Sequence, residues 1–254
     1  MKPRELLERA QVLLPRAHHG VAVLAYHLVG GTTDSPVDLP LDVFRAQLDR
    51  LAATRRVRSL GAALGGAPRD EAFVLTFDDA YRNFREVAWP LLVERGLPAT
   101  LYVPVDFVDG SGASPIRGVT LPPLSWADLR AMVAEGLTVG SHSVTHRNLR
   151  RLAPAEVERE LEGSRKALED RLGVAVTSFC YPQAKSSRAA ERLAGRCYES
   201  AVVAGGRRFT PGRVDRRAIP RLPVRRDLRD FDALLTSPLW LSEAVASALR
   251  QVVP

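Results

Sequence analysis

Short apolar segments alternate with amphipathic ones along this chain, and that alternation is the feature that most constrains its fold. Strand-like apolar runs recur at 21–26, 73–77, 100–103, 137–141, 178–181 and 201–203, with a seventh candidate at 217–220. Helical periodicity marks 41–53, 84–95, 125–134, 154–172 and 187–197, and a closing helix is expected over 239–253. Strands that alternate with helices form parallel sheets with helices outside. The sequence therefore predicts an α/β fold, and a barrel suits a chain of 254 residues.

The composition fits one globular domain, which we expect to span 1–254 with a core of about 20–235. Hydrophobic residues make up 46% of the chain and charged residues 26%. No apolar run approaches the roughly 18 residues of a membrane span. The segment 1–19 carries charges and lacks the apolar core of a signal peptide. As given, the sequence predicts a cytoplasmic protein, with peripheral membrane association left open.

Two adjacent carboxylates, Asp78 and Asp79, follow the apolar run 73–77. Parallel strands end at the face of an α/β barrel where catalytic residues gather. Because neighbouring carboxylates repel each other, a fold that keeps both usually gives them different roles. The expected division is one metal ligand and one proton acceptor.

A second cluster follows the run 137–141. His142 and His146 are four residues apart, with Ser-Val-Thr between them and no glutamate, so this is not the helical metalloprotease motif. Two imidazoles and one carboxylate form a three-ligand set typical of catalytic zinc. Asp79 is the natural third ligand, and Asp78 is then the candidate general base.

The two clusters together resemble a known family. Thr76-Phe77-Asp78-Asp79 and Ser141-His142-Ser143-Val144-Thr145-His146 resemble the first two motifs of the NodB-type polysaccharide deacetylases, carbohydrate esterase family 4. The resemblance extends over most of 26–224. It implies a distorted (β/α)7 barrel, the NodB homology domain, and a metal-dependent hydrolase that removes N-acetyl groups from sugars. By position, Asp78 resembles the catalytic base, and Asp79, His142 and His146 resemble the metal ligands, usually of Zn2+, with Co2+, Ni2+ or Fe2+ as alternatives.

The third motif departs from the family pattern, Arg-x-Pro-Tyr-Gly. The matching segment is Cys180-Tyr181-Pro182-Gln183-Ala184, so a cysteine stands where the arginine that orients the base is expected. The backbone N–H of Gln183 can still act as an oxyanion donor, because that role does not need the side chain. Tyr181 and Pro182 are expected to shape the substrate site beside it. Whether Cys180 and Gln183 lower activity is left open.

The general acid is expected at the other end of the chain, because no histidine follows His146. Tyr26-His27-Leu28-Val29 resembles a Tyr-His-x-Val motif of one branch, the biofilm-glycan deacetylases. We therefore assign His27 as the acid, against a purely structural strand-end histidine as the alternative. The segment 220–224 resembles the ending of that branch, and Arg221 is a candidate to replace the missing arginine beside Asp78.

The formal net charge of +7 is concentrated in 205–230, which holds nine arginines and three aspartates. The segment 207–229 either binds an anionic or phosphate-linked glycan or is solvated surface, and we favour the second. Aromatic residues do not alternate with the basic ones in the way that binding of single-stranded nucleic acid would require.

Two other functions are kept as alternatives. One is a catalytically inactive, glycan-binding barrel, which the altered third motif favours. The other is a deacylase of a small non-polymeric amide, which the expected cytoplasmic location favours.

Overall fold

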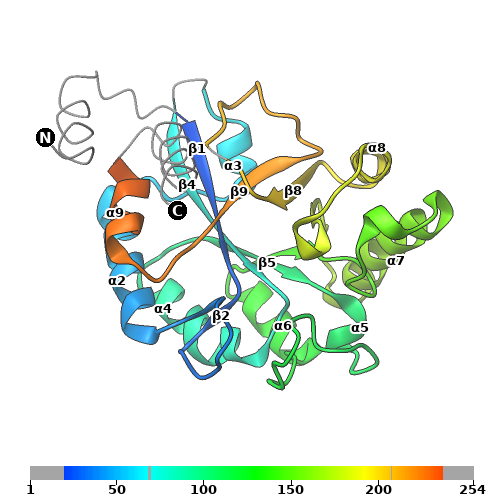
Figure 1. Cartoon of the computed structure of the whole chain (residues 1–254), viewed down its shortest axis with the longest axis horizontal. Helices are drawn as coiled ribbons and strands as arrows, with labels where there is room; N and C mark the ends of the chain where they lie inside the picture. The colour runs from blue at the N-terminus through cyan, green and yellow to red at the C-terminus, as the bar shows by residue number, and fades with distance from the viewer. Residues whose placement is uncertain (1–19, 68–69, 207, 237–254) are drawn as a thin grey trace, which may run out of the picture.

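Seven parallel strands form a closed barrel in the order β1-β4-β5-β6-β7-β8-β9, as Figure 1 shows. This computed structural model describes residues 20–67, 70–206 and 208–236. The strands are β1 (Gly20–Tyr26), β4 (Glu71–Asp78), β5 (Ala99–Val103), β6 (Thr138–Ser141), β7 (Ser178–Cys180), β8 (Ser200–Ala204) and β9 (Ile219–Pro223). Pairing of β9 with β1 closes the barrel. The prediction of a seven-stranded α/β barrel is confirmed.

Helices surround the strands, with α2, α4, α6, α7, α8 and α9 outside the sheet in Figure 1. The helices are α2 (Leu41–Thr54), α3 (Leu60–Leu64), η1 (Phe84–Ala88), α4 (Trp89–Glu94), α5 (Val105–Val108), α6 (Trp126–Ala134), η2 (Leu149–Arg151), α7 (Pro154–Leu172), η3 (Pro182–Ala184), α8 (Arg188–Cys197) and α9 (Leu228–Thr236). A small sheet of β2 (Leu28–Val29) and β3 (Asp38–Leu39) lies outside the barrel sheet. Within the described residues, no helix combines the length and apolar character that crossing a bilayer requires.

Alternate residues of each strand serve two different cores, because side chains in a strand point to opposite faces. Ala22 and Leu24 of β1 belong to the larger core, together with Phe44 of α2. Val21 and Val23 belong to a second core inside the barrel, which also holds Tyr102 and Cys180. Arg221 is the register partner of Val23 and therefore shares the inward face. A cationic side chain thus enters the barrel interior.

Gly140 allows the Tyr102 ring to fill this interior. A Cβ atom at Gly140 would lie 2.4 Å from Cε1 of Tyr102 and 2.8 Å from Oγ of Ser178. No real side chain tolerates such contacts without movement of its neighbours. The glycine in β6 is therefore required by packing.

Several boundaries differ from the sequence predictions. The helix expected from Phe84 begins as a π-helix, in which the Trp89 N–H donates to the Phe84 carbonyl five residues back. Pro90 explains the change, since it has no N–H to continue the regular ladder. The last strand is 219–223 rather than 217–220, because Asp215 accepts hydrogen bonds from Arg217 in a turn before the strand. The strands β2 and β3 and the helix α9 were not predicted, and the helix expected over 239–253 lies outside the described residues.

Candidate active site

Three predicted metal ligands meet at the carboxyl ends of β4 and β6. Asp79 directly follows β4, and His142 directly follows β6. Oδ1 of Asp79 lies 3.6 Å from Nε2 of His142 and 3.4 Å from Nε2 of His146. One ligand atom from each of the three residues lies within 4.8 Å of the others. The sequence motifs are therefore brought together in space.

The backbone around this cluster adopts conformations that side chains normally avoid. Seven non-glycine residues in the described part of the chain have a positive φ, and six of them belong to the loops after β4, β6 and β7. These six are Asp79, Ala80, Ser143, His146, Gln183 and Ala184, with φ between 55° and 77°. Such strain persists only where the surrounding structure holds it, and it concentrates at functional sites.

The donor set fits a divalent cation. Oδ1 of Asp79 is buried and has no hydrogen-bond partner. Burial and the neighbouring Asp78 carboxylate raise the pKa of Asp79 well above its usual range, and a cation bound beside it would favour its charged form. Burial lowers the pKa of His142 to about 4 and that of His146 to about 3, which keeps both rings neutral and able to ligate.

The tautomer of His142 also suits a metal ligand. Its Nδ1 lies 2.8 Å from the backbone carbonyl oxygen of Cys180. A carbonyl only accepts, so Nδ1 carries the proton and Nε2 presents its lone pair toward Asp79. This arrangement, in which the second ring nitrogen is fixed by a carbonyl, is usual for histidines that bind metals.

Asp78 lies in the barrel mouth and is held by Arg221. Nη1 of Arg221 donates to Oδ1 of Asp78 and Nη2 donates to Oδ2, each over 2.7 Å. Burial raises the pKa of Asp78, but the Arg221 guanidinium outweighs this, and the pKa lies below its usual range. Asp78 is therefore a carboxylate with a fixed orientation. Arg221, predicted as a partner of Asp78, lies against it.

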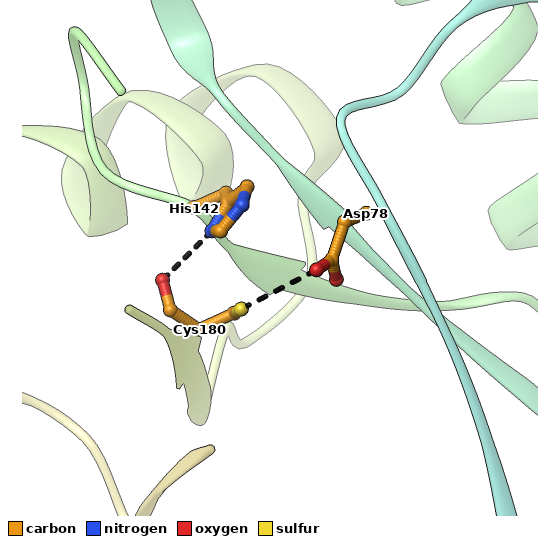
Figure 2. A group of neighbouring side chains, drawn as sticks. All are labelled: Asp78, His142 and Cys180. Atoms are coloured by element: carbon orange, nitrogen blue, oxygen red, sulfur yellow. Dashed lines mark hydrogen bonds between the residues drawn. The ribbon is translucent and has the colours of Figure 1, made fainter. Parts of the chain in front are cut away.

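Cys180 occupies the space between these groups. Figure 2 shows its carbonyl toward the His142 ring and its thiol toward Asp78. Asp78, His142 and Cys180 also have ligand atoms within 4.8 Å of one another. However, Nη2 of Arg221 donates to Sγ of Cys180 over 2.9 Å and also to Asp78. A second metal ion there would meet this cation, so we do not regard the group as a metal site.

His27 directly follows β1 and lies near Asp78. Its Nε2 lies 3.6 Å from Oδ2 of Asp78, and 28% of its side chain is exposed. Burial lowers the pKa of His27, while the Asp78 carboxylate raises it and Arg221 lowers it further. An exposed edge next to a carboxylate places this imidazole where a reacting group can reach it.

A cleft of about 940 Å³ opens over these residues. Its walls are the loops 32–37 and 115–121, and its floor includes His27, Asp78, Asp79, His142 and His146. Tyr181 and Gln183 also line the cleft, whereas Pro182 is buried and is not among the residues that line it. The Tyr181 hydroxyl donates to the Arg217 carbonyl over 2.8 Å, and the residue is only 1% exposed, so its hydroxyl is already engaged inside the protein.

Within its described residues, 208–229, the basic segment does not form one continuous rim. Arg208 donates to the carbonyls of Gly20 and Leu234, and Arg217 pairs with Asp215. Among the described arginines of 207–229, Arg221 is the one that lines the cleft. Binding of an anionic glycan through this segment stays a prediction.

Sequence reasoning missed one buried acid near the site, Glu160 of α7. It accepts hydrogen bonds from the loop that carries His142 and His146. The sequence did indicate that this glutamate is buried. The i, i+3, i+4, i+7 pattern of a buried helical face includes Val157, Glu160, Leu161 and Ser164. A glutamate on such a stripe needs partners inside the protein.

Comparisons with known proteins agree with this geometry. The family profile "Polysaccharide deacetylase" matches residues 65–198, just over half of the chain. The Bacillus subtilis protein named "Putative polysaccharide deacetylase YxkH" is 24% identical over 166 residues, which is 63% of this chain and 55% of that protein. The chain therefore spans about half the length of this curated relative.

Solved structures share the fold. The Streptococcus pyogenes deacetylase PplD, in complex with acetate, is 19% identical with a TM-score of 0.75, covering 85% of this chain and 97% of PplD. IcaB from Ammonifex degensii is 21% identical with a TM-score of 0.69, covering 87% of this chain and 97% of IcaB. With the family profile matched across the segment that carries Asp78, Asp79, His142 and His146, the chain belongs to the polysaccharide deacetylase family.

Proposed function

We propose that this protein is a metal-dependent deacetylase that removes N-acetyl groups from an N-acetylated sugar and releases acetate. The proposal rests on one observation: a candidate metal site and a candidate general base lie side by side in one cleft. Two neutral imidazoles lie beside the unpartnered Oδ1 of Asp79, and an arginine-held carboxylate, Asp78, is next to them. The family membership agrees with this chemistry.

Asp79, His142 and His146 would hold the metal, and zinc is the ion that a set of two imidazoles and one carboxylate suits best. When bound, a divalent metal supplies a Lewis acid for a carbonyl group and lowers the pKa of a bound water. All three residues line the cleft, so a metal that they held would be accessible to substrate from the cleft.

The chain's own groups then divide the proton transfers. Asp78 accepts a proton from the attacking water, while Arg221 fixes both carboxylate oxygens in place. The Gln183 N–H, near the start of the short helix η3 where N–H groups lack helical partners, donates to the developing oxyanion. His27 delivers a proton to the sugar nitrogen as the C–N bond breaks. Asp78 gains the proton that the water loses, and His27 loses the proton that the sugar nitrogen gains. One amide and one water therefore give one acetic acid, released as acetate, and one amine, with no net proton taken from the protein.

Acetate release from a substrate panel tests the proposal. The panel holds free, polymeric and pyrophosphate-linked N-acetyl sugars, with a small cyclic imide and a small acyl amide beside them. We expect zinc-loaded wild type to release acetate from at least one sugar. Asp78→Asn should lower turnover by at least about 100-fold, because it removes the base. Its metal content should match that of wild type, since Asp78 is no ligand in this assignment.

Other outcomes would select the alternatives. Full activity in Asp78→Asn would show that the base is wrongly assigned. Turnover of the small amides alone would favour a deacylase of non-polymeric substrates. Glycan binding without turnover of any substrate would favour an inactive binding barrel. The Arg221 guanidinium beside Asp78 and Cys180 supports the active enzyme instead, because it can take the place of the arginine that the third motif lacks.

A further inference from the structure

Helix α7 turns two polar side chains toward the loop that follows β6. Glu160 is 4% exposed and Ser164 is fully buried, on a face that otherwise carries Val157, Leu161 and Leu168. Burial of a carboxylate is costly unless hydrogen bonds compensate it. Hydrogen bonds within the protein must therefore compensate for the burial of these two side chains.

The Glu160 carboxylate is fully engaged by the histidine loop. Its Oε2 accepts from the backbone N–H groups of Val144 and Thr145, each over 2.9 Å. Its Oε1 accepts from the Thr145 hydroxyl over 2.6 Å. Hydrogen bonds to a charged acceptor are stronger than those between neutral groups. Residues 144 and 145, which lie between the two histidines, are thus held by one side chain.

Ser164, one helical turn further on, extends this support. Its hydroxyl donates to the Glu160 carbonyl over 2.6 Å and accepts from Oγ of Ser141 over 2.8 Å. Oγ of Ser141 in turn accepts from the Ser143 N–H over 3.3 Å. A chain of hydrogen bonds therefore runs from α7 to the residue immediately after His142.

The opposite side of the loop is fixed by α5. The N–H groups of Val105 and Asp106 donate to the carbonyls of Ser143 and Val144, over 3.2 and 3.0 Å. The loop needs this bracing, since Ser143 and His146 have φ values of 68° and 56°. Strained conformations of this kind persist only where the surrounding structure holds them.

We propose that Glu160, supported by Ser164, is a positioning residue that sets the metal affinity of the site. It acts through the backbone of 143–145, which fixes the distance between the His142 and His146 rings. The inference rests on the ligand set given under Proposed function. Glu160 is neither ligand nor base, because its oxygens are engaged by the loop.

Metal affinity measured on the full chain tests this role. Metal-free protein is titrated with Zn2+ in competition with a chromophoric chelator, and the visible spectrum of the Co2+ form reports ligand geometry. We expect Glu160→Ala to bind Zn2+ about 10- to 100-fold more weakly, as for other residues that orient metal ligands. Glu160→Gln should bind within about threefold of wild type, because the amide oxygen accepts from both N–H groups and its NH2 donates to Thr145.

Glu162→Ala is the matched control, since Glu162 lies on the exposed face of the same helix. It should keep the wild-type affinity and the wild-type Co2+ spectrum. Wild-type affinity in Glu160→Ala would overturn the proposal, because a merely structural glutamate would change stability alone. Equal loss in Glu160→Gln and Glu160→Ala would also overturn it.

A second variant decides the matter if Glu160→Ala does not fold. Thr145→Val removes one contact to Glu160 and should weaken Zn2+ binding about 2- to 10-fold. Unchanged affinity in Thr145→Val would then refute the inference. Failure of wild type to bind any metal would remove the ligand set and the proposed function with it. Normal metal binding without acetate release would remove the function alone.

Discussion

Removal of the Arg221 guanidinium should destabilise the fold through the charge that it leaves behind. In Arg221→Leu, the Asp78 carboxylate remains in the barrel mouth without its partner. The side chains of Arg221 and Asp78 are only 2% and 3% exposed. Breaking a buried pair by removing one member costs about 3–5 kcal/mol in the free energy of unfolding. The two charge-assisted bonds to Asp78, at roughly 1.5–3 kcal/mol each, give a similar figure.

Arg217→Leu provides the matched control. Arg217 also forms a two-point contact with an aspartate, through Nε and Nη2 to Asp215. That pair is about half exposed, at 50% and 49%, and precedes the same strand. Exposed pairs contribute about 0–1 kcal/mol. Both arginines make a two-point contact with an aspartate, but one pair is buried and the other is exposed, so the comparison tests the effect of burial.

Urea denaturation in a metal-free buffer measures both variants, together with Asp78→Asn and the double variant Asp78→Asn/Arg221→Leu. The loss in free energy of unfolding in the double variant should be smaller than the sum of the losses in the two single variants, by about 0.5–3 kcal/mol. The reason is that neither charge is then left without its partner. The reasoning fails if Arg221→Leu lowers the free energy of unfolding no more than Arg217→Leu does. It also fails if the losses in Asp78→Asn and Arg221→Leu add up to the loss in the double variant. Acetate release in Arg221→Ala equal to that of wild type would separately remove its role beside Asp78.

Two further predictions concern the metal and the barrel interior. By elemental analysis, we expect wild type to hold about one equivalent of metal and His146→Ala to lose it, since two ligands remain of three. Retention of one equivalent in His146→Ala would refute the ligand assignment. Gly140→Ala should lower the free energy of unfolding by about 1–3 kcal/mol or more, because the new methyl group would overlap the Tyr102 ring. Gly61→Ala, at an exposed helical glycine where an added methyl group would meet no neighbour within 4 Å, should instead raise it by about 0.5–1 kcal/mol. Equal effects at the two glycines would contradict the packing argument.

Local patterns in the amino-acid sequence were sufficient for the fold class and for the place of the candidate ligands in it. Apolar periodicity records which face of each segment is buried, so the strands and helices could be read locally. The polar residues that end the runs 21–26, 73–77 and 137–141 are His27, the Asp78–Asp79 pair and His142. The carboxyl ends of parallel strands meet at one face, so these residues had to converge once the barrel was assumed. A capping box of Ser125 and Asp128 begins α6, and this pattern too is local to a few neighbouring residues.

Contacts between distant parts of the chain supply the groups that support that face. Arg221 lies 143 positions from Asp78 in the chain, and closure of the barrel between β9 and β1 delivers it there. The family resemblance named it as a candidate, but no local pattern in the chain could fix this contact. Glu160 shows the same limit, because its helix position indicated burial without indicating a partner. Periodicity specifies which side of an element faces inward, whereas the neighbours on that side depend on packing of the whole chain.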